Sequence, residues 1–311
     1  MKRIIIFMSI LINGLFGYML YKADYSVQEL RKPDLENKAP RLPNYLISYA
    51  DGDPVFFRNQ NALAASAQNK GFDFILNYRK PILDKAFQEK YADILNINTG
   101  AGLWLWKPYI FLQTMQQAPE NALIFYADVG FVYVRDVQEW VDKLSVSGAY
   151  GNEDVVLMNV DDYHNFNNTN LLNWLPRPIS KEWGLDKLPK DQIPKFIESG
   201  LIVARNTPNA RAFMQKWLDI CARRDYAFMP FKTDELVRGF TYDQSLLSIV
   251  AYKYPQGVKI IPKSEMKKYT VFHHRHPGNN KPVLPLQVLP LKQIREWAED
   301  KLPNLFLYIG F

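Results

Sequence analysis

The sequence is poor in the residues that build disulfide frameworks and cysteine metal clusters. It has a single cysteine, Cys221, in 311 residues, which excludes an internal disulfide bond and a metal site made of cysteines. It also lacks an HExxH zinc-protease motif, a GxSxG nucleophile elbow, a Walker A loop and a GxGxxG dinucleotide fingerprint. These absences argue against zinc proteases, α/β-hydrolases, P-loop nucleotide hydrolases and Rossmann dehydrogenases.

A concentration of charge of one sign is also missing. The formal net charge is +6, but the lysines and arginines are scattered along the chain, so no nucleic-acid partner is expected. The sequence has no internal repeat and no low-complexity block. Its 48% hydrophobic and 14% aromatic residues are typical of a folded chain, and 311 residues suffice for one large domain or two smaller ones.

The N-terminal segment differs from the rest of the chain. An apolar run, IIIFMSILINGLFGYMLY, covers residues 4–21 and is close to the minimum of about 17 residues for a membrane span. No small-x-small cleavage site follows it, so residues 1–21 are expected to form an uncleaved signal-anchor helix; a cleaved signal peptide and a buried helix are the alternatives. The polar, proline-containing residues 22–42 are expected to form a stem. Basic residues flank both ends of the run and leave the orientation open.

Strand and helix patterns alternate from residue 43 onward. Strands are predicted at 44–51, 72–78 and 123–128, with helices at 57–71, 81–95 and 106–119 between them. The second half adds a strand pair within 148–160, strands at 196–206 and 258–262, and helices at 209–224 and 242–254. The alternation predicts an α/β fold with a mostly parallel central sheet flanked by helices. Ligands of such sheets collect at the carboxyl ends of the strands, where Asp51 and Asp128 fall.

Two stretches in the first half carry residues suited to a diphosphate and a metal. Asp128 ends the strand LIFYAD and is followed by Gly130, so its carboxylate can approach a divalent cation or a sugar hydroxyl; a turn-capping acid is the alternative. Lys107 opens a helix after the glycines of TGAGLWLWKP, which suits a diphosphate. The alternative there is that the tryptophans belong to the core and Lys107 to the solvated surface.

Three further stretches in the second half carry candidate residues. Glu198 of IESGLIVARN suits hydrogen bonds to sugar hydroxyls or the role of a base, and Asp243 and Gln244 of TYDQSLL open a helix together. A capped turn and an ordinary helix N-terminal acid are the alternatives. The stretch VFHHRHPGNNKP suits metal and phosphate binding, with a basic surface loop as the alternative; its candidates are His273, His274, His276, Arg275 and Lys281.

The ordered set of motifs resembles nucleotide-sugar glycosyltransferases of the GT-A fold over about residues 43–285. The pattern is similar to that of a group marked by WKP and YaDaG, and more distantly to glycogenin-like and lipopolysaccharide galactosyltransferases. The resemblance implies a GT-A domain over residues 43–311, and metal ligation by Asp128, His273, His274 and His276. It implies catalytic roles for Asp128, Glu198 and Asp243. It implies donor contacts by Tyr49, Ala50, Asp51, Lys107, Gly130, Gly200, Gln244, Arg275 and Lys281.

The chain departs from the family pattern at two places. Gly130 stands where the second acid of the DxD metal motif would be, and the HxxGxxKP pattern of the distant relatives is one residue short. The resemblance implies an Mn²⁺- or Mg²⁺-dependent transferase that moves a hexose-type sugar from a nucleoside diphosphate sugar to a glycan, lipid-linked or protein-linked hydroxyl. The alternatives are a catalytically weak nucleotide-sugar-binding protein, and a nucleotidyltransferase or hydrolase on a similar sheet. The anchor would place the domain in a Golgi-type lumen in a eukaryote, or on the cytoplasmic face of the inner membrane in a bacterium.

Overall fold

The computed structural model describes residues 42–272, apart from 146–147, 152, 161–168 and 230–238. All of them belong to one of the two compact units of the chain, which covers Leu42–Phe311. The predicted anchor and stem lie outside the described residues except for Leu42, as do the predicted metal and phosphate ligands at 273–281. None of the helices within the described part has the length and apolar character that a membrane crossing requires.

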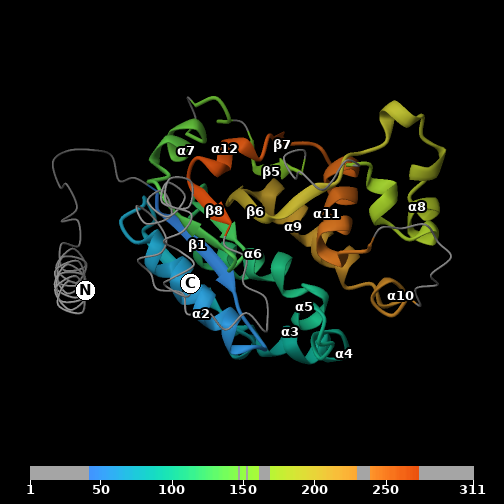
Figure 1. Ribbon diagram of the computed structural model, residues 1–311, viewed down its shortest axis with the longest axis horizontal. Coiled ribbons are helices and arrows are strands. Elements are labelled where there is room, and N and C mark those ends of the chain that lie inside the picture. Colours follow the sequence, from blue (N-terminus) through green and yellow to red (C-terminus); the bar gives the residue numbers. More distant parts are fainter. Residues whose placement is uncertain (1–41, 146–147, 152, 161–168, 230–238, 273–311) are drawn as a thin grey trace, which may run out of the picture. The chain divides into compact units, whose positions relative to one another are not determined.

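A six-stranded sheet in the order β2–β1–β3–β6–β5–β7 forms the centre of the domain (Figure 1). Strands β1, β2 and β3 are mutually parallel, and β7 is parallel to β5, whereas β6 runs antiparallel to both of its neighbours. Five strands therefore share one direction, which confirms the predicted mostly parallel sheet. The strands are β1 (Asn44–Tyr49), β2 (Phe74–Tyr78), β3 (Leu123–Ala127), β5 (Val155–Asn159), β6 (Ile197–Arg205) and β7 (Val258–Ile261).

The central strands are apolar because both faces of the sheet are covered. Every residue of β1 and β3 is buried, and successive side chains alternate between two core clusters, as the period of a strand requires. Ile47 and Ile124 belong to the cluster that contains buried residues of α6, α9 and α11. Leu46 and Phe125 belong to the cluster that contains buried residues of α2, α7 and α12. Helices thus flank the sheet on both faces, as predicted.

The longer helices begin within three residues of their predicted starts. They are α2 (Pro54–Ala67), α6 (Trp106–Gln117), α9 (Pro208–Cys221) and α11 (Tyr242–Lys253). The shorter ones are α3 (Lys85–Lys90), α4 (Ala92–Leu95), α5 (Gly100–Leu103), α7 (Gln138–Lys143), α8 (Arg177–Glu182), α10 (Arg224–Ala227) and α12 (Ser264–Lys267). A separate antiparallel ribbon pairs β4 (Phe131–Tyr133) with β8 (Thr270–Phe272).

Two local predictions are wrong. The single helix expected at 81–95 is divided into a 3₁₀ turn at Lys80–Ile82, α3 and α4, because the Asp84 carboxylate accepts hydrogen bonds from the amides of residues 86 and 87 and starts a new helix. Of the strand pair expected within 148–160, the described residues form one strand, β5, because residues 148–151 form turns, with the Gly151 amide bonded to the Gly148 carbonyl.

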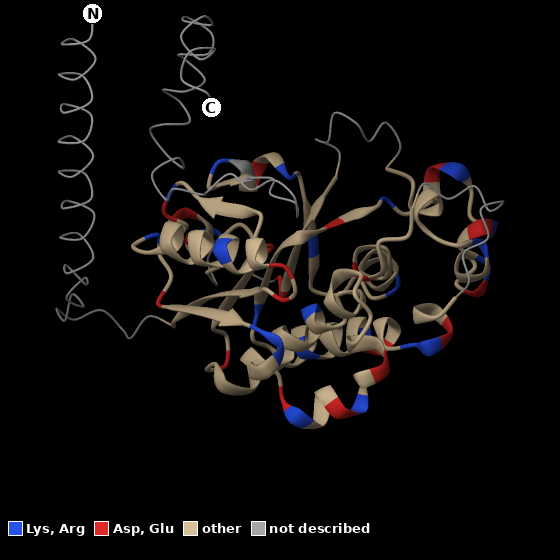
Figure 2. Ribbon diagram, turned by 60° about the horizontal axis from the view of Figure 1, so that its bottom comes forward, with Lys and Arg blue, Asp and Glu red and all other residues tan. Residues whose placement is uncertain are grey.

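Acidic and basic residues are interspersed along the described chain in Figure 2. Most of the ion pairs join side chains that are partly exposed, such as Arg224–Asp93 at 2.7 Å. Exposed pairs of this kind contribute little to stability. Two lysines are exceptions, because their side chains are almost completely buried, and both lie at one edge of the sheet.

Candidate active site

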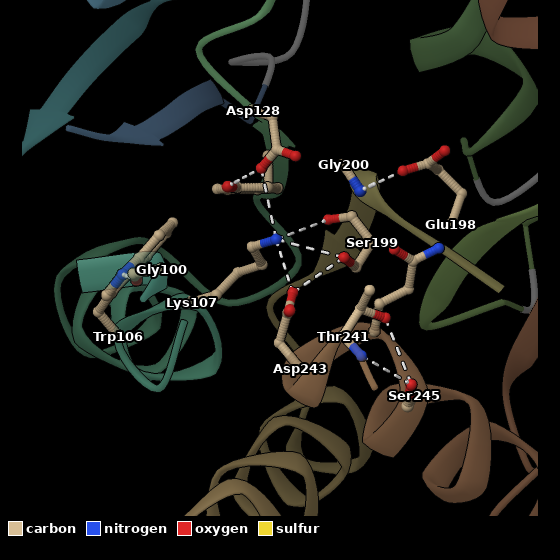
Figure 3. Close-up of polar contacts among 12 residues, drawn as sticks. Gly100, Trp106, Lys107, Asp128, Glu198, Ser199, Gly200, Thr241, Asp243 and Ser245 are labelled. Atoms are coloured by element: carbon tan, nitrogen blue, oxygen red, sulfur yellow. Dashed lines mark hydrogen bonds and ion pairs between the residues drawn. The ribbon is translucent and has the colours of Figure 1, made fainter. Parts of the chain in front are cut away.

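The carboxyl edge of the parallel strands collects the acidic residues of the site. Asp51 follows β1 and Asp128 follows β3, and these neighbouring parallel strands end at the same edge. Strand β6 runs the other way, so its first residues, rather than its last, arrive there. The Asp128 amide donates to the Gly200 carbonyl at 2.8 Å, which brings the segment Glu198–Gly200 beside Asp128. Figure 3 shows Asp128 and the segment Glu198–Gly200 together with the first turns of α6 and α11.

Lys107 lies at the centre of the cluster and is 1% exposed. Its Nζ donates to Asp243 Oδ2 at 2.7 Å and to Ser199 Oγ at 3.3 Å, and lies 3.4 Å from Asp128 Oδ1 (Figure 3). Burial alone would lower the pKa of Lys107, but the carboxylates of Asp128 and Asp243 outweigh burial and raise it. The ammonium is therefore an internal counter-ion. The predicted contact of Lys107 with a diphosphate stays a prediction.

Asp243, the first acid of α11, is buried beside that ammonium. Its Oδ2 also accepts a hydrogen bond from Ser199 Oγ at 2.9 Å, and its backbone carbonyl accepts one from Trp217 Nε1 at 3.0 Å. Burial raises the pKa of Asp243, and the contact with Lys107 opposes that rise. The carboxylate is thus fixed by α6 and β6, and the backbone of the same residue is fixed by α9.

Asp128 is the accessible acid of the cluster, with 39% of its side chain exposed. Its Oδ1 accepts a hydrogen bond from the hydroxyl of Tyr126, two residues back on β3, and also faces Lys107. Burial is the main cause, and the charge of Asp128 the second, of a pKa of Tyr126 well above its usual value. The phenol therefore stays protonated and donates a hydrogen bond to Asp128. Oδ1 of Asp128 is therefore held by Tyr126 and Lys107, while part of the side chain reaches the surface.

Glu198 is the third acid, and its carboxylate is buried at the start of β6. Its Oε1 accepts a hydrogen bond from the Gly200 amide at 2.9 Å, and its Oε2 accepts one from Lys263 Nζ at 2.6 Å. The pairing of β6 with β5 shifts register here, because Leu157 faces Ile202 whereas Met158 faces Glu198. Bulges of this kind re-aim side chains and are common beside active sites.

Gly200 separates the carboxylates of Asp128 and Glu198. A Cβ at this position would lie 2.9 Å from Asp128 Oδ2, 2.9 Å from Glu198 Oε1 and 3.1 Å from Phe131 Cε2. The two carboxylate oxygens therefore both lie within hydrogen-bond length of the position that a Cβ of Gly200 would occupy. Only a residue without a side chain leaves that point open.

Among the described residues, the charges of the cluster do not balance. Asp128, Glu198 and Asp243 supply three carboxylates, against the two ammonium groups of Lys107 and Lys263. Within this described set one negative charge is in excess, and the accessible member is Asp128. An oxygen ligand with excess negative charge suits a hard divalent cation such as Mg²⁺ or Mn²⁺ in both charge and donor type. Within the described residues, however, no three potential ligand side chains are grouped so as to hold a metal ion.

Three predicted donor contacts, Tyr49, Ala50 and Asp51, lie at the end of β1, and most of their surface is packed inside the protein. Tyr49 stacks on Trp106 with 4.0 Å between ring centroids, and both rings are buried. The core interpretation of Trp106 is therefore correct. Ala50 is buried as well, whereas Asp51 is half-buried and its Oδ2 accepts a hydrogen bond from the Tyr49 hydroxyl at 3.2 Å. Of this trio, Asp51 is the residue that reaches the surface.

The structure places the remaining predicted residues as follows. Gly130 is half-buried in the turn after Asp128, and Gln244 is half-buried in the first turn of α11. The predicted ligands at 273–281 lie outside the described chain, and their roles stay predictions; these are His273, His274, Arg275, His276 and Lys281.

Three members of the cluster carried no predicted role. They are Tyr126, Ser199 and Lys263, and each contacts one of the three acids. A sequence signal existed for Lys263, because it follows the end of β7 after a proline, at the edge where ligands of parallel sheets collect. Ser199 and Tyr126 stand inside motifs in which the neighbouring acids carry the predicted roles.

No family model and no curated protein matches the sequence. Solved structures with a similar fold include a glycosyltransferase involved in glycosylation of the major capsid of PBCV-1, with a TM-score of 0.41, 8% identity, and coverage of 71% of this chain and 82% of that chain. Mouse xyloside xylosyltransferase 1 gives a TM-score of 0.42 and 10% identity over 78% of this chain and 99% of its own.

A third similar structure is glucosyl-3-phosphoglycerate synthase from Mycobacterium tuberculosis in complex with Mn²⁺, UDP and glucosyl-3-phosphoglycerate. Its TM-score is 0.35 and its identity 10%, over 87% of this chain and 81% of that chain. Similarities of this size carry no argument about substrate or mechanism. All three of these solved structures are GT-A-type glycosyltransferases.

Proposed function

We propose that the protein is a glycosyltransferase that moves a hexose-type sugar from a nucleoside diphosphate sugar to an acceptor hydroxyl. The observation that carries the proposal is the convergence of Lys107, Asp128, Glu198 and Asp243 at the carboxyl edge of the sheet. These residues come from four segments that are far apart in sequence, and they are the polar members of the motifs that resemble the family.

The accessible carboxylate of Asp128 is the proposed contact with the donor diphosphate. Its orientation is preorganised by Tyr126 and Lys107, so the site needs little rearrangement when charge develops. Asp128 would hold a divalent cation, which when bound supplies positive charge to the departing diphosphate. The dependence on Mn²⁺ or Mg²⁺ is part of the proposal.

The carboxylates also suit the sugar itself. The bond between the anomeric carbon and the diphosphate oxygen breaks, the bond to the acceptor oxygen forms, and the proton of the acceptor hydroxyl passes to the departing diphosphate or to water. The anomeric carbon becomes oxocarbenium-like, so nearby negative charge stabilises it. Glu198 and Asp243 already accept hydrogen bonds from lysines, which favours an electrostatic role for these two acids over proton transfer.

The partners are proposals of the same kind. A glycan, a glycolipid or a protein-linked sugar would supply the acceptor hydroxyl. The apolar run at residues 4–21 would anchor the domain to a membrane by a single span, either in a Golgi-type lumen or on the cytoplasmic face of an inner membrane.

A second candidate is a nucleotide-sugar-binding protein with little turnover on the same fold. One observation favours it: Gly130 stands where the second acid of the metal motif is expected. A protein of this kind would bind a donor without releasing nucleoside diphosphate.

The test is a donor screen on the full-length protein. Nucleoside diphosphate release is followed from a panel of UDP-, GDP- and CDP-sugars, with and without Mn²⁺ and with sugar acceptors. We expect release from one donor, and a loss of about 10²-fold in Asp128→Asn, the usual effect of removing one preorganised electrostatic contact. The matched control is Asp219→Asn, which changes an exposed acid on α9. Equal activity of the wild type and Asp128→Asn would refute the assignment of Asp128, and binding without release would favour the second candidate.

A further inference from the structure

The chemistry proposed above uses Glu198 but gives its buried partner Lys263 no role of its own. The side chains of Lys263 and Glu198 are 5% and 9% exposed, and the Nζ to Oε2 distance is 2.6 Å. Lys263 belongs to the short link between β7 and α12, whereas Glu198 belongs to β6. The contact therefore joins two segments 65 residues apart.

Stability alone does not explain such a pair. Removing two charges from water costs about as much as their attraction returns, and apolar residues of the same volume often serve the fold as well. A buried ion pair is better explained where a charge must be held in one position. The position of this charge is defined, because the other oxygen of Glu198 accepts a hydrogen bond from the Gly200 amide at 2.9 Å.

Lys263 and the Gly200 amide together fix both oxygens of Glu198. The fixed Oε1 lies 2.9 Å from the point that a Cβ of Gly200 would occupy, and Asp128 Oδ2 lies at the same distance from that point. Because both oxygens lie within hydrogen-bond length of that point, they are close enough together for one small hydrogen-bond donor to approach both from the exposed side of Asp128. A hydroxyl group of a sugar is such a donor.

We propose that Lys263 is a positioning residue that sets Glu198 to accept a hydrogen bond from a hydroxyl group of the transferred sugar. The inference rests on the proposed function and adds to it a determinant of sugar recognition. In this proposal Glu198 contacts the sugar, whereas Asp128 contacts both the diphosphate and the sugar. Lys263 therefore matters for the sugar and much less for the nucleotide.

The test separates those two parts of the donor. Binding of UDP-glucose and UDP, and of GDP-mannose and GDP, is measured by calorimetry with Mn²⁺ on full-length wild type, Lys263→Met, Lys263→Arg and Lys216→Met. For the pair that the wild type binds, we expect Lys263→Met to weaken binding of the nucleotide sugar about tenfold and that of the bare nucleotide less than twofold. Lys263→Arg keeps the charge and is expected to stay within about threefold of the wild type. Lys216→Met, a half-buried lysine stacked on Tyr254, is the matched control.

A double variant protects the test from a failure to fold. Lys263→Met/Glu198→Gln leaves neither charge buried alone, and circular dichroism checks its fold. Because Lys263 acts through Glu198, the double variant should bind the nucleotide sugar as weakly as Glu198→Gln and no worse. Equal loss for sugar and bare nucleotide in Lys263→Met, or no loss for either, would overturn the inference and leave the proposed function standing. A wild type that binds none of the four compounds, nor the donor found in the screen, would refute the proposed function and the inference with it.

Discussion

Replacing Lys107 by methionine removes the ammonium nearest to the buried carboxylate of Asp243. The two groups are 2.7 Å apart, with side-chain exposures of 2% and 4%. Breaking a buried pair by removing one partner costs about 3–5 kcal/mol, because it leaves an uncompensated charge in the core. That is a large part of the free energy of unfolding of a typical domain, about 5–15 kcal/mol. We expect Lys107→Met to lower the unfolding free energy by this amount at neutral pH.

The cost should depend on pH in a defined direction. Burial already raises the pKa of Asp243, and removing Lys107 takes away the influence that opposes the rise. A carboxyl group with a raised pKa binds its proton more tightly in the folded state, so its contribution to stability is complete below the unfolded pKa of about 3.9 and is lost as the pH rises through the folded value. The deficit of Lys107→Met should therefore shrink on acidification from neutral pH toward pH 4.

Urea denaturation of the wild type and the variant at pH 7.5 and at pH 4.5 measures this deficit. The double variant Lys107→Met/Asp243→Asn leaves no buried charge alone and should recover a substantial part of the loss at pH 7.5. A cost below about 1 kcal/mol at pH 7.5, or a cost that is the same at both pH values and is not reduced in the double variant, would refute the assignment of Lys107 as a buried counter-ion.

Three further substitutions test the surroundings of the cluster. Gly200→Ala puts a Cβ 2.9 Å from an oxygen of each of two carboxylates. Donor turnover should therefore fall at least about 10²-fold, and the free energy of unfolding should drop by about 1–3 kcal/mol. An active alanine variant would mean that the carboxylates move freely. Tyr126→Phe removes the hydrogen bond to Asp128 and should lower the free energy of unfolding by about 1 kcal/mol. The rise in the activation free energy of donor turnover should be larger, and a change in stability without a change in turnover would contradict the positioning role of Tyr126. Thr207→Ala removes the N-cap of α9 far from the cluster, so denaturation should show a loss of about 1 kcal/mol, and any change in turnover would count against the location of the site.

The sequence predicts the strands and the acids that follow them, because both are local signals. Buried apolar runs ending in Asp51 and Asp128 define β1 and β3, and parallel strands end at one edge. The direction of β6 is not a local signal, since its apolar pattern is the same whichever way it runs. Its antiparallel direction brings Glu198, near its start, to the same edge as Asp128.

The environment of each charged residue escapes prediction for a different reason. Lys107 at the start of a helix resembles a solvated lysine, and its burial depends on Asp243, 136 residues later in the chain. Lys263 follows an ordinary strand and belongs to no motif. The pairing of a lysine with an acid is fixed by tertiary contacts, and spacing along the chain does not encode it.

The location of a bound nucleotide tests most directly whether the donor binds at the carboxyl edge of the sheet. A crystal structure of the full-length protein with Mn²⁺ and UDP, or with the nucleoside diphosphate found in the donor screen, would locate it. We expect a diphosphate beside the Asp128 carboxylate, with the nucleoside toward Asp51 at the end of β1. A nucleotide bound elsewhere, for example in the surface hollow lined by Lys216, Asp219 and Arg223, with the carboxyl edge of the sheet empty, would contradict it.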